Sequence, residues 1–326
     1  MKEFYIRNNE AGQRMDKYLK KLLCGAPAGF IYKMLRKKNI VLNDKKAKGE
    51  EKLLTGDCIK LFLSEETFQK FSVSMDAKKN EARRPDLDLE RLPFQILYED
   101  EDILAIDKPF GMLSQKAKPE DVSANEYILE YLRKSGKTDP AEQNTFRPSV
   151  CNRLDRNTSG VLIAGKTLRG LQQMSEALRT RRVVKEYRCI VEGIVDAPRH
   201  ITGYLHKDAA TNKAAVSEEK LSLEDKWIET EYEPVCRYAD ATLLEVRLIT
   251  GRTHQIRAHL SSIGHPIVGD LKYGASGKRG VSTQLLHAFR IRLEEGLEIT
   301  APLPNRFQKA IRALQQAQEG TNGHME

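Results

Sequence analysis

Apolar residues recur at helical spacing in four stretches of the chain. Two of these lie near the N-terminus, at 14–23 and 30–38, and both carry lysines and arginines away from the apolar positions. The other two lie at 125–134 and 168–181, and a shorter helix is expected over 256–263. Residues three and four positions apart share one face of a helix, so the pattern predicts helices that pack one side against a core.

Runs of aliphatic, aromatic and β-branched residues, several of them alternating with polar ones, predict strands. These runs lie at 4–6, 39–44, 58–63, 94–109, 161–164, 188–194, 241–248 and 285–293, and an acidic turn divides the run at 94–109 into two strands. The strands cluster and do not alternate strictly with helices. This order predicts an α+β fold in which the larger part of the chain surrounds a mixed or antiparallel sheet.

A polar stretch separates the N-terminal part of the chain from the rest. Residues 64–92 are poor in large aliphatic side chains, and such a composition buries too little surface to order itself. The chain of 326 residues is long enough for two domains. We therefore predict a module over 1–65, a linker over 66–91 and a body over 92–312. From 313 to 326 the periodicity is lost, and we expect a frayed tail.

The composition is that of a soluble globular protein, with 40% hydrophobic and 31% charged residues. No apolar run approaches the roughly 18 residues that cross a membrane, and the N-terminus lacks the apolar core of a signal peptide. We therefore expect a cytoplasmic protein that does not use a membrane. The five cysteines are odd in number and form no C-x-x-C pair, which favours reduced thiols over disulfides or a zinc site.

The net charge of +8 is distributed unevenly. Residues 1–65 hold 15 Lys and Arg against 8 Asp and Glu, which accounts for +7 of the total. This concentration of charge predicts an N-terminal module that meets a polyanion and a body with another task.

A candidate reactive segment is Arg153-Leu154-Asp155-Arg156, where one carboxylate stands between two guanidinium groups. The turn residues Asn, Thr, Ser and Gly follow at 157–160, ahead of the apolar run at 161–164. Asp155 is therefore expected on a loop that enters a buried strand, a common position for reactive groups. Taken alone, this pattern is more typical of a structural ion pair on a turn, and only the surrounding motifs favour chemistry.

The surrounding blocks resemble the RluA-type pseudouridine synthases, which isomerise uridine in RNA. Residues 152–160 resemble the family signature H-R-L-D-x-x-T-S-G, and K-E-Y at 185–187 and T-G-R-T-H-Q-I-R-A-H-L at 250–260 follow in the family order. D-K-P-F-G-M at 107–112 also matches, and the resemblance covers about 92–304. One departure is Asn152, which stands where the family usually has His.

The resemblance implies a fold and a set of roles. The fold is the pseudouridine synthase fold, a long bent sheet with the active cleft across its middle. Asp155 is implied as the catalytic carboxylate and Tyr187 as the aromatic that packs on the flipped base. Arg257 is implied as the charge partner of Asp155, with Arg252 as the second candidate. Arg153 is implied as the residue that fills the space left by the flipped uridine or contacts the displaced backbone.

The implied reaction breaks and remakes a bond to the same sugar carbon, so no redox cofactor and no outside atom are required. One carboxylate is sufficient, by the logic of glycoside chemistry. His254 and His259 lie five positions apart without a carboxylate or Cys at ligand spacing. We therefore expect no metal and no cofactor, and we interpret both histidines as hydrogen-bonded structural residues.

The N-terminal module resembles the S-four type RNA-binding domain, a small α/β unit named after a ribosomal protein. Its second helix would contact RNA through Lys33, Arg36, Lys37 and Lys38. The alternative is an ordinary solvated helix face.

The resemblance implies large-subunit (23S) ribosomal RNA as the substrate, with transfer RNA as the second candidate, and we expect a monomer. A catalytically silent RNA-binding protein is a further alternative, although Arg153, Asp155, Tyr187 and Arg257 are all present. An RNA hydrolase or nucleotidyl enzyme is disfavoured, because the sequence has no phosphate-binding loop or H-E-x-x-H motif.

Overall fold

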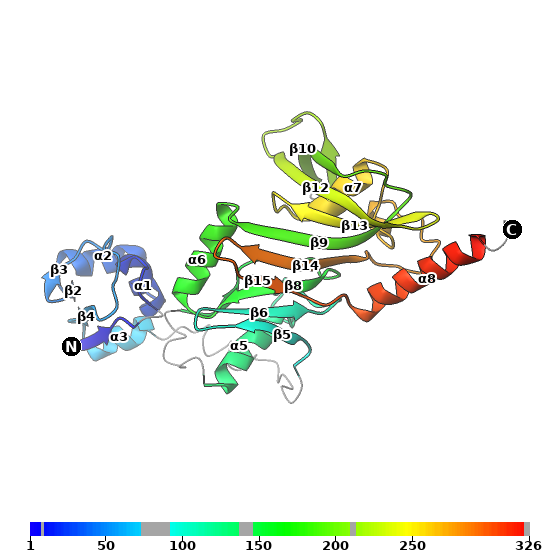
Figure 1. The fold of residues 1–326 in the computed structure, drawn as a ribbon. Helices are drawn as coiled ribbons and strands as arrows, with labels where there is room; N and C mark the ends of the chain where they lie inside the picture. Colours follow the sequence, from blue (N-terminus) through cyan, green and yellow to red (C-terminus); the bar gives the residue numbers. More distant parts are fainter. Residues whose placement is uncertain (8–9, 73–91, 137–145, 209–212, 323–326) are drawn as a thin grey trace.

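The computed structural model describes residues 1–7, 10–72, 92–136, 146–208 and 213–322. Within these residues the chain forms a small N-terminal module and a larger body built on one long sheet (Figure 1). No helix among them is long and apolar enough to cross a lipid bilayer.

The N-terminal module packs three helices on a four-stranded antiparallel sheet of order β1-β4-β2-β3. Its elements are β1 (Lys2–Tyr5), α1 (Met15–Leu22), α2 (Ala28–Arg36), β2 (Ile40–Leu42), β3 (Lys45–Lys46), β4 (Cys58–Leu61) and α3 (Glu65–Ser72). Ile31 and Leu35 of α2 are buried against Leu19 of α1 and Ile59 of β4. The two predicted helices and the three predicted strands are therefore present, as α1, α2, β1, β2 and β4.

The prediction that the linker begins at residue 66 is wrong. Residues 65–72 form α3, whose Phe68 ring stacks on Phe4 at 5.8 Å and whose Phe71 ring lies 4.6 Å from Phe30. The two phenylalanines pack on the module core, so aromatic burial orders a segment that is poor in aliphatic residues. The rest of the predicted linker, 73–91, lies outside the described residues.

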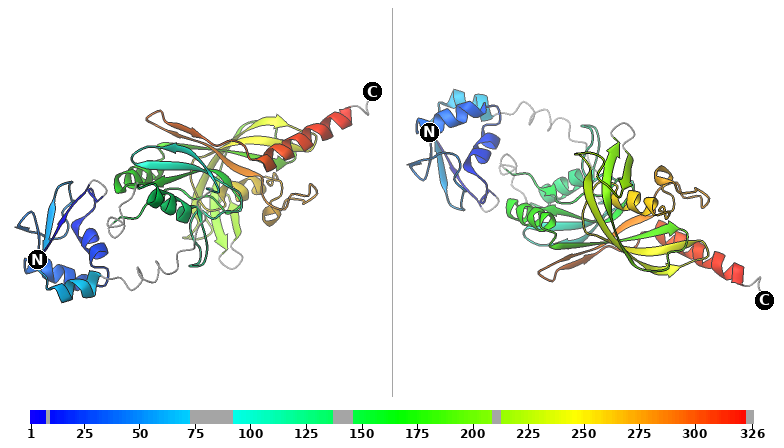
Figure 2. Two further views of the ribbon diagram at one scale, coloured as in Figure 1. Left: turned by 90° about the horizontal axis from the view of Figure 1, so that it is seen from below. Right: turned by 90° about the horizontal axis from the view of Figure 1, so that it is seen from above.

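The body is organised around a sheet that has eleven strands among the described residues. Along its main path the order is β11-β10-β12-β13-β9-β14-β8-β6-β5, with β15 paired to β14 and β7 to β8. All pairs are antiparallel except β14 with β8. Figure 2 shows that the sheet bends along its length. The predicted α+β fold with a mixed, mainly antiparallel sheet is confirmed.

The strands are β5 (Gln95–Glu99), β6 (Ile103–Lys108), β7 (Ser149–Val150), β8 (Ser159–Gly165), β9 (Val183–Glu192), β10 (Arg199–Asp208), β11 (Lys213–Ser217), β12 (Lys226–Arg237), β13 (Ala241–Leu248), β14 (Leu286–Leu293) and β15 (Glu298–Thr300). The helices are α5 (Ala124–Lys134), α6 (Leu168–Arg179), α7 (Gln255–Ser262), the short 3-10 helix η2 (Leu271–Tyr273) and α8 (Asn305–Asn322).

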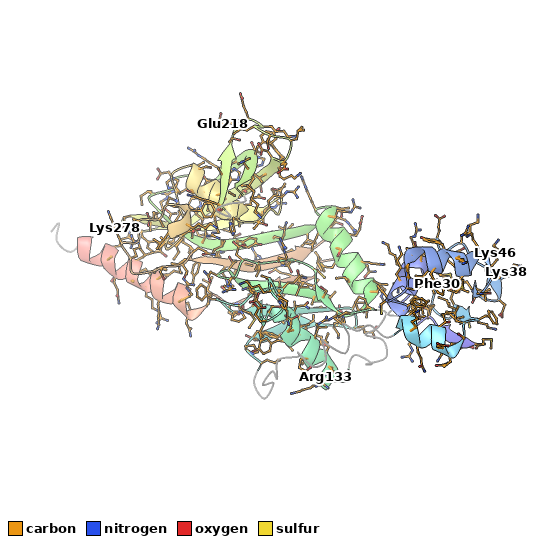
Figure 3. All side chains as sticks on the ribbon, turned by 180° about the vertical axis from the view of Figure 1, so that it is seen from behind. Phe30, Lys38, Lys46, Arg133, Glu218 and Lys278 are labelled. Atoms are coloured by element: carbon orange, nitrogen blue, oxygen red, sulfur yellow. The ribbon has the colours of Figure 1, made fainter. Side chains whose placement is uncertain are left out.

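The helices cover both faces of the sheet, and side chains fill the space beneath them (Figure 3). Ile128 of α5 and Ile256 of α7 share one core with Leu162 and Val246 of the sheet. On the other face, α6 joins the core around Ile163, and α8 packs beside β9 and β13. The sheet, packed on both faces, is therefore a rigid scaffold that holds the loops at its strand ends in place.

The prediction of a frayed tail from residue 313 is also wrong. The helix α8 continues to Asn322, and Leu314 is buried in the same core as Phe307. Phe307, Ile311 and Leu314 lie four and three positions apart and share one helix face, so packing orders this end. Residues 323–326 lie outside the described part of the chain.

Candidate active site

A cleft with a volume of about 990 Å³ opens on the sheet face that carries α5 and α7. Its walls come from segments that are far apart in the sequence: the loop after Gly111, residues 150–158, the end of α6, β9, and the turn between β13 and α7. Asp155, Tyr187, Arg257, Arg153 and Arg252 all line this cleft. The five residues predicted for the body are therefore brought together.

Asp155 lies on the loop between β7 and β8, as the turn residues predicted. The amide of Thr158 donates to the Asp155 carbonyl at 3.0 Å and closes the turn. Ser114 exchanges hydrogen bonds with the backbone of Leu154 at 2.9 and 3.0 Å. At Gly160 φ is +111°, and a Cβ there would overlap the Ala288 carbonyl of β14, so this turn requires glycine. The carboxylate is thus fixed by neighbours on both sides.

Asn152, the departure from the family signature, has a structural position. Its amide nitrogen donates to the Val161 carbonyl at 3.2 Å, and its amide oxygen accepts from the Ile163 amide at 2.8 Å. The side chain thereby ties the start of the loop to β8. It forms no contact with Asp155 among the described residues.

Arg257 of α7 is the charge partner of Asp155. Its Nη1 lies 3.2 Å from Asp155 Oδ2, while Nε and Nη2 bind Asp270 at 2.6 and 2.8 Å. The guanidinium also lies over the Tyr273 ring at 4.8 Å. Arg252 is exposed and has no ion pair with Asp155. Between the two candidates, the geometry selects Arg257.

Two features tie the Arg257 guanidinium to its partners. The Asp270 side chain is only 1% exposed, and its bidentate contact sets the plane of the guanidinium. Burial acts to lower the pKa of Arg257, but the hydrogen bonds and charges of Asp270 and Asp155 outweigh it and raise the pKa. Arg257 is therefore a permanent cation aimed at Asp155.

Tyr187 of β9 is buried and stands across from Val246 of β13. Burial, followed by the charge of Asp155, raises the pKa of its phenol well above the ordinary value. Tyr187 is therefore a neutral phenol at physiological pH, with a ring that forms part of the cleft wall.

Cations surround the cleft. In addition to Arg153 and Arg252, the lining includes Lys116, Arg156, Arg179, Arg181 and Lys185. Burial, followed by the charge of Arg181, lowers the pKa of Lys185. Among the described residues, the lining holds these cations and one carboxylate, Asp155, which suits a substrate with several negative charges.

Lys108 holds the loop after Asp155 in place through hydrogen bonds. Its side chain is fully buried, and its ammonium donates to the carbonyls of Met112, Pro109 and Arg156 at 2.7, 3.0 and 3.2 Å. Burial lowers its pKa to about 7, against the opposing charges of Asp155 and Asp107.

Two residues near Asp155, Asp270 and Tyr273, were not predicted from the sequence, and both contact Arg257. His254 was interpreted as a structural residue, and it does bond to Tyr273 at 2.9 Å, but it also places its Nε2 at 3.9 Å from Asp155 Oδ2. His259, by contrast, is the structural residue expected, bound to Thr230 at 3.0 Å, and burial lowers its pKa to about 4. The described residues contain no group of three potential metal ligands.

The four residues predicted for the second helix of the module, Lys33, Arg36, Lys37 and Lys38, are all exposed. Lys38 has a positive φ of 59° at the turn into β2. Lys45 and Lys46 of β3, which were not singled out, are also exposed and extend this surface. Figure 3 labels Lys38 and Lys46 on the module.

Comparisons with known proteins give the family. Residues 102–262 match the family model described as RNA pseudouridylate synthase. The protein named ribosomal large subunit pseudouridine synthase C of Pasteurella multocida is 33% identical to this chain, over 97% of this chain and 94% of that protein. Those of Vibrio cholerae (31%, over 96% of each chain) and Haemophilus ducreyi (33%, over 95% of each) are similar to the same extent.

Two solved human structures share the fold. RNA Pseudouridylate Synthase Domain Containing 4 has a TM-score of 0.56 at 22% identity, over 74% of this chain and 98% of that one. RNA Pseudouridylate Synthase Domain Containing 1 has a TM-score of 0.52 at 23% identity, over 68% of this chain and 94% of that one. The resemblance in the sequence motifs is confirmed, and this chain belongs to the RNA pseudouridylate synthase family.

Proposed function

We propose that this pseudouridine synthase isomerises specific uridines of large-subunit ribosomal RNA, with Asp155 as its catalytic carboxylate. One observation carries the proposal: Asp155 faces a cation-lined cleft and is paired with a buried Arg257 that Asp270 holds in place. The relatives at 31–33% identity are named for the ribosomal large subunit, which favours that RNA over transfer RNA.

The reaction conserves atoms. Asp155 attacks the sugar carbon C1′ as the bond from C1′ to uracil N1 breaks, and the uracil leaves with the electron pair. The uracil turns within the cleft, its C5 bonds to C1′ as the carboxylate departs, and the C5 proton is lost while N1 gains a proton, so that the product is an isomer of the substrate. Arg257, with its cation 3.2 Å from Asp155, stabilises the negative charge that the carboxylate carries before the attack and regains when the bond to the sugar breaks.

Tyr187 packs on the uracil and limits its movement while the base is free. Since burial raises the pKa of its phenol, the residue acts as a neutral wall and hydrogen-bond donor and not as a phenolate base. The proton from C5 therefore goes to another acceptor. Asp155 is a candidate once its bond to the sugar has broken.

The cations divide into two groups by position. Arg153 is exposed next to Asp155 and takes the space vacated by the flipped uridine, while Arg252, which is also exposed and lines the cleft, contacts the RNA backbone. On the N-terminal module, an S-four-like RNA-binding domain in this proposal, Lys33, Arg36, Lys37 and Lys38 contact phosphates at a distance from the reaction.

This assignment requires no metal and no cofactor, and we propose that the protein works as a monomer in the cytoplasm, where ribosomal RNA is available. A catalytically silent RNA-binding role is disfavoured by the pairing of Asp155 with Arg257, because an ion pair with a cation this deeply buried is costly to keep without a task.

The substrate is tested by mapping pseudouridines in total RNA from cells with the gene, without it, and with Asp155→Asn in its place. We expect a small set of large-subunit positions to lose modification in both the deletion and the variant. Sites lost only from transfer RNA would replace the proposed substrate, and an unchanged map would contradict the activity.

A further inference from the structure

His254 occupies a strained position beside the reactive carboxylate. It precedes α7 with φ 59° and ψ 14°, the left-handed region, which costs about 1 kcal/mol for a residue other than glycine. Its side chain is 13% exposed, lines the cleft and places Nε2 at 3.9 Å from Asp155 Oδ2. Strain that is retained beside a reactive group points to a use for the side chain.

Hydrogen bonds determine which ring nitrogen of His254 carries the proton. The phenol oxygen of Tyr273 lies 2.9 Å from the Ala214 amide and 2.9 Å from His254 Nδ1. A backbone amide can only donate, so the phenol accepts from Ala214 and gives its own hydrogen to Nδ1. The reverse arrangement would leave the hydroxyl hydrogen of a residue that is 2% exposed without a partner. The neutral ring therefore carries its proton on Nε2, toward Asp155.

The charges around the ring favour its neutral form. Burial lowers the pKa of His254, and the cations Arg257 of α7 and Lys272 of η2 act in the same direction. Asp155 and Asp270 act against them without reversing the shift. A neutral imidazole donates one hydrogen bond to the carboxylate without placing a second full positive charge beside the Arg257 guanidinium.

Both side-chain contacts of the Asp155 carboxylate reach the same oxygen. Arg257 Nη1 lies 3.2 Å from Oδ2, and His254 Nε2 approaches Oδ2 as well. Among the described residues no side chain donates a hydrogen bond to Oδ1. The two oxygens are therefore distinguished before substrate arrives.

We propose that His254 is a positioning residue that donates from Nε2 to Oδ2 of Asp155, in a tautomer set by Tyr273, and so presents Oδ1 to the ribose carbon. The inference rests on the proposed role of Asp155. At 3.9 Å the contact is longer than a hydrogen bond and shortens when substrate closes the cleft, as active-site hydrogen bonds commonly do.

The test compares His254→Gln with His254→Met in the full chain. The two side chains are unbranched, nearly equal in length and meet the same cost at positive φ, but only Gln can donate. We expect His254→Met to lower the single-turnover rate at saturating RNA by about tenfold to a hundredfold, as loss of a hydrogen bond to a charged group does. His254→Gln should restore most of that rate. Both should bind RNA within about twofold of the parent, because Asp155 orientation affects the reacting state more than the bound state.

Tyr273→Phe tests the tautomer while keeping the ring over Arg257. Nδ1 then loses its donor and protonates more readily, so the acid limb of the rate profile should move to higher pH. In nitrogen-labelled protein, the His254 ring should show a protonated Nε2 in the parent and a mixture of tautomers in Tyr273→Phe. Three results would each overturn the proposal. The first is equal rates in the Gln and Met variants, and the second is a rate loss in His254→Met that only follows its folded fraction. The third is a parent spectrum with the proton on Nδ1. An inactive parent with the expected spectrum would instead count against the proposed function alone.

Discussion

Arg257 has three neighbours that compete for its charge, and their order explains how Asp155 stays reactive. Asp270 takes two of the guanidinium nitrogens, and the Tyr273 ring covers one face. The third nitrogen is left for Asp155, whose side chain is 23% exposed against 8% for Arg257. The better-buried Asp270 therefore satisfies most of the cation, and Asp155 keeps a lone oxygen available for chemistry.

Asp270→Asn is expected to weaken both stability and turnover. The variant keeps the shape but leaves a buried guanidinium without its main counter-charge, which should lower the free energy of unfolding by about 3 kcal/mol or more. Arg257 would also swing toward Asp155, so the single-turnover rate should fall by at least about tenfold with little change in RNA affinity. Asp240→Asn, which breaks the exposed ion pair to Arg279, is the control. Denaturant unfolding and rate assays that gave the two variants the same values would contradict this account.

Arg257→Ala and Arg252→Ala separate the two candidate partners of Asp155 by the quantity that each variant changes. Arg257→Ala removes the guanidinium that lies 3.2 Å from Asp155 and leaves Asp270 buried without its counter-charge, so the single-turnover rate at saturating RNA should fall by at least about tenfold. Arg252→Ala should lower RNA affinity and leave that rate unchanged, because its side chain is exposed and not paired with Asp155. The opposite result would make Arg252 the partner.

At the scale of elements, the junction of β8 and β14 holds the Asp155 loop. These two strands form the parallel pair, and Ser159 at the start of β8 stands opposite His287. The Ser159 hydroxyl lies 2.8 Å from His287 Nδ1, and Nε2 lies 3.3 Å from the Ala301 carbonyl. The ring is fully buried, and burial lowers its pKa to about 4.

This junction predicts acid sensitivity. The unfolded chain binds a proton at His287 near the ordinary pKa of 6.5, whereas the folded chain does so only near 4. The contribution of neutral His287 to the free energy of unfolding is therefore fully present above pH 6.5. It is lost as the pH falls toward 4, by a total of roughly 3 kcal/mol. Urea unfolding between these pH values should show a smaller decline in His287→Gln than in the parent. An equal decline would mean that His259, whose pKa burial also lowers to about 4, and other groups carry the effect.

Elements with a regular apolar pattern were predictable from the sequence. The strand over 241–248 is found at the predicted residues, and the helix α7 begins one residue early. The strands β10, β11 and β12 were missed, and β12 has a polar appearance because Glu229, Glu231 and Glu233 alternate with its buried residues. Helix α3 was missed because its two phenylalanines bury against residues far away in the sequence.

The same limit applies at the site. Asp155 and Arg257 were predictable because each lies in a motif, but the selection of Arg257 over Arg252 depends on the turn of α7. Asp270 and Tyr273 act through contacts 13 and 16 positions from Arg257, on a segment without regular strand or helix pattern. Such contacts are set by tertiary packing and produce no periodic pattern in the sequence.

In the whole molecule, most of the net positive charge lies in a different part of the chain from the candidate active site. The module holds +7 of the net charge of +8, while the carboxylate and its partners lie in the body. Neutralising Lys33, Arg36, Lys37 and Lys38 with Gln should weaken RNA binding and reduce the salt dependence, by about 3 in the slope of log K against log salt if all four contact phosphates. The single-turnover rate at saturating RNA should stay unchanged.

The matched control neutralises four exposed cations of the body, Lys220, Lys278, Lys309 and Arg312. Both variants carry the same net charge, so a general loss of attraction would lower affinity equally in the two. Equal salt slopes would show that the basic face of the module is only a solvated surface.

The central claim is that Asp155 carries the isomerisation, and Asp155→Asn tests it most directly. The measurement is the release of tritium from carbon 5 of labelled uridine in a large-subunit RNA fragment, at saturating enzyme and in one turnover. The account predicts a rate reduced by more than about a thousandfold, with RNA affinity and unfolding close to the parent, because the variant keeps the shape and loses the nucleophile. Turnover at more than a few per cent of the parent rate, beside a fully active Asp240→Asn control, would contradict it.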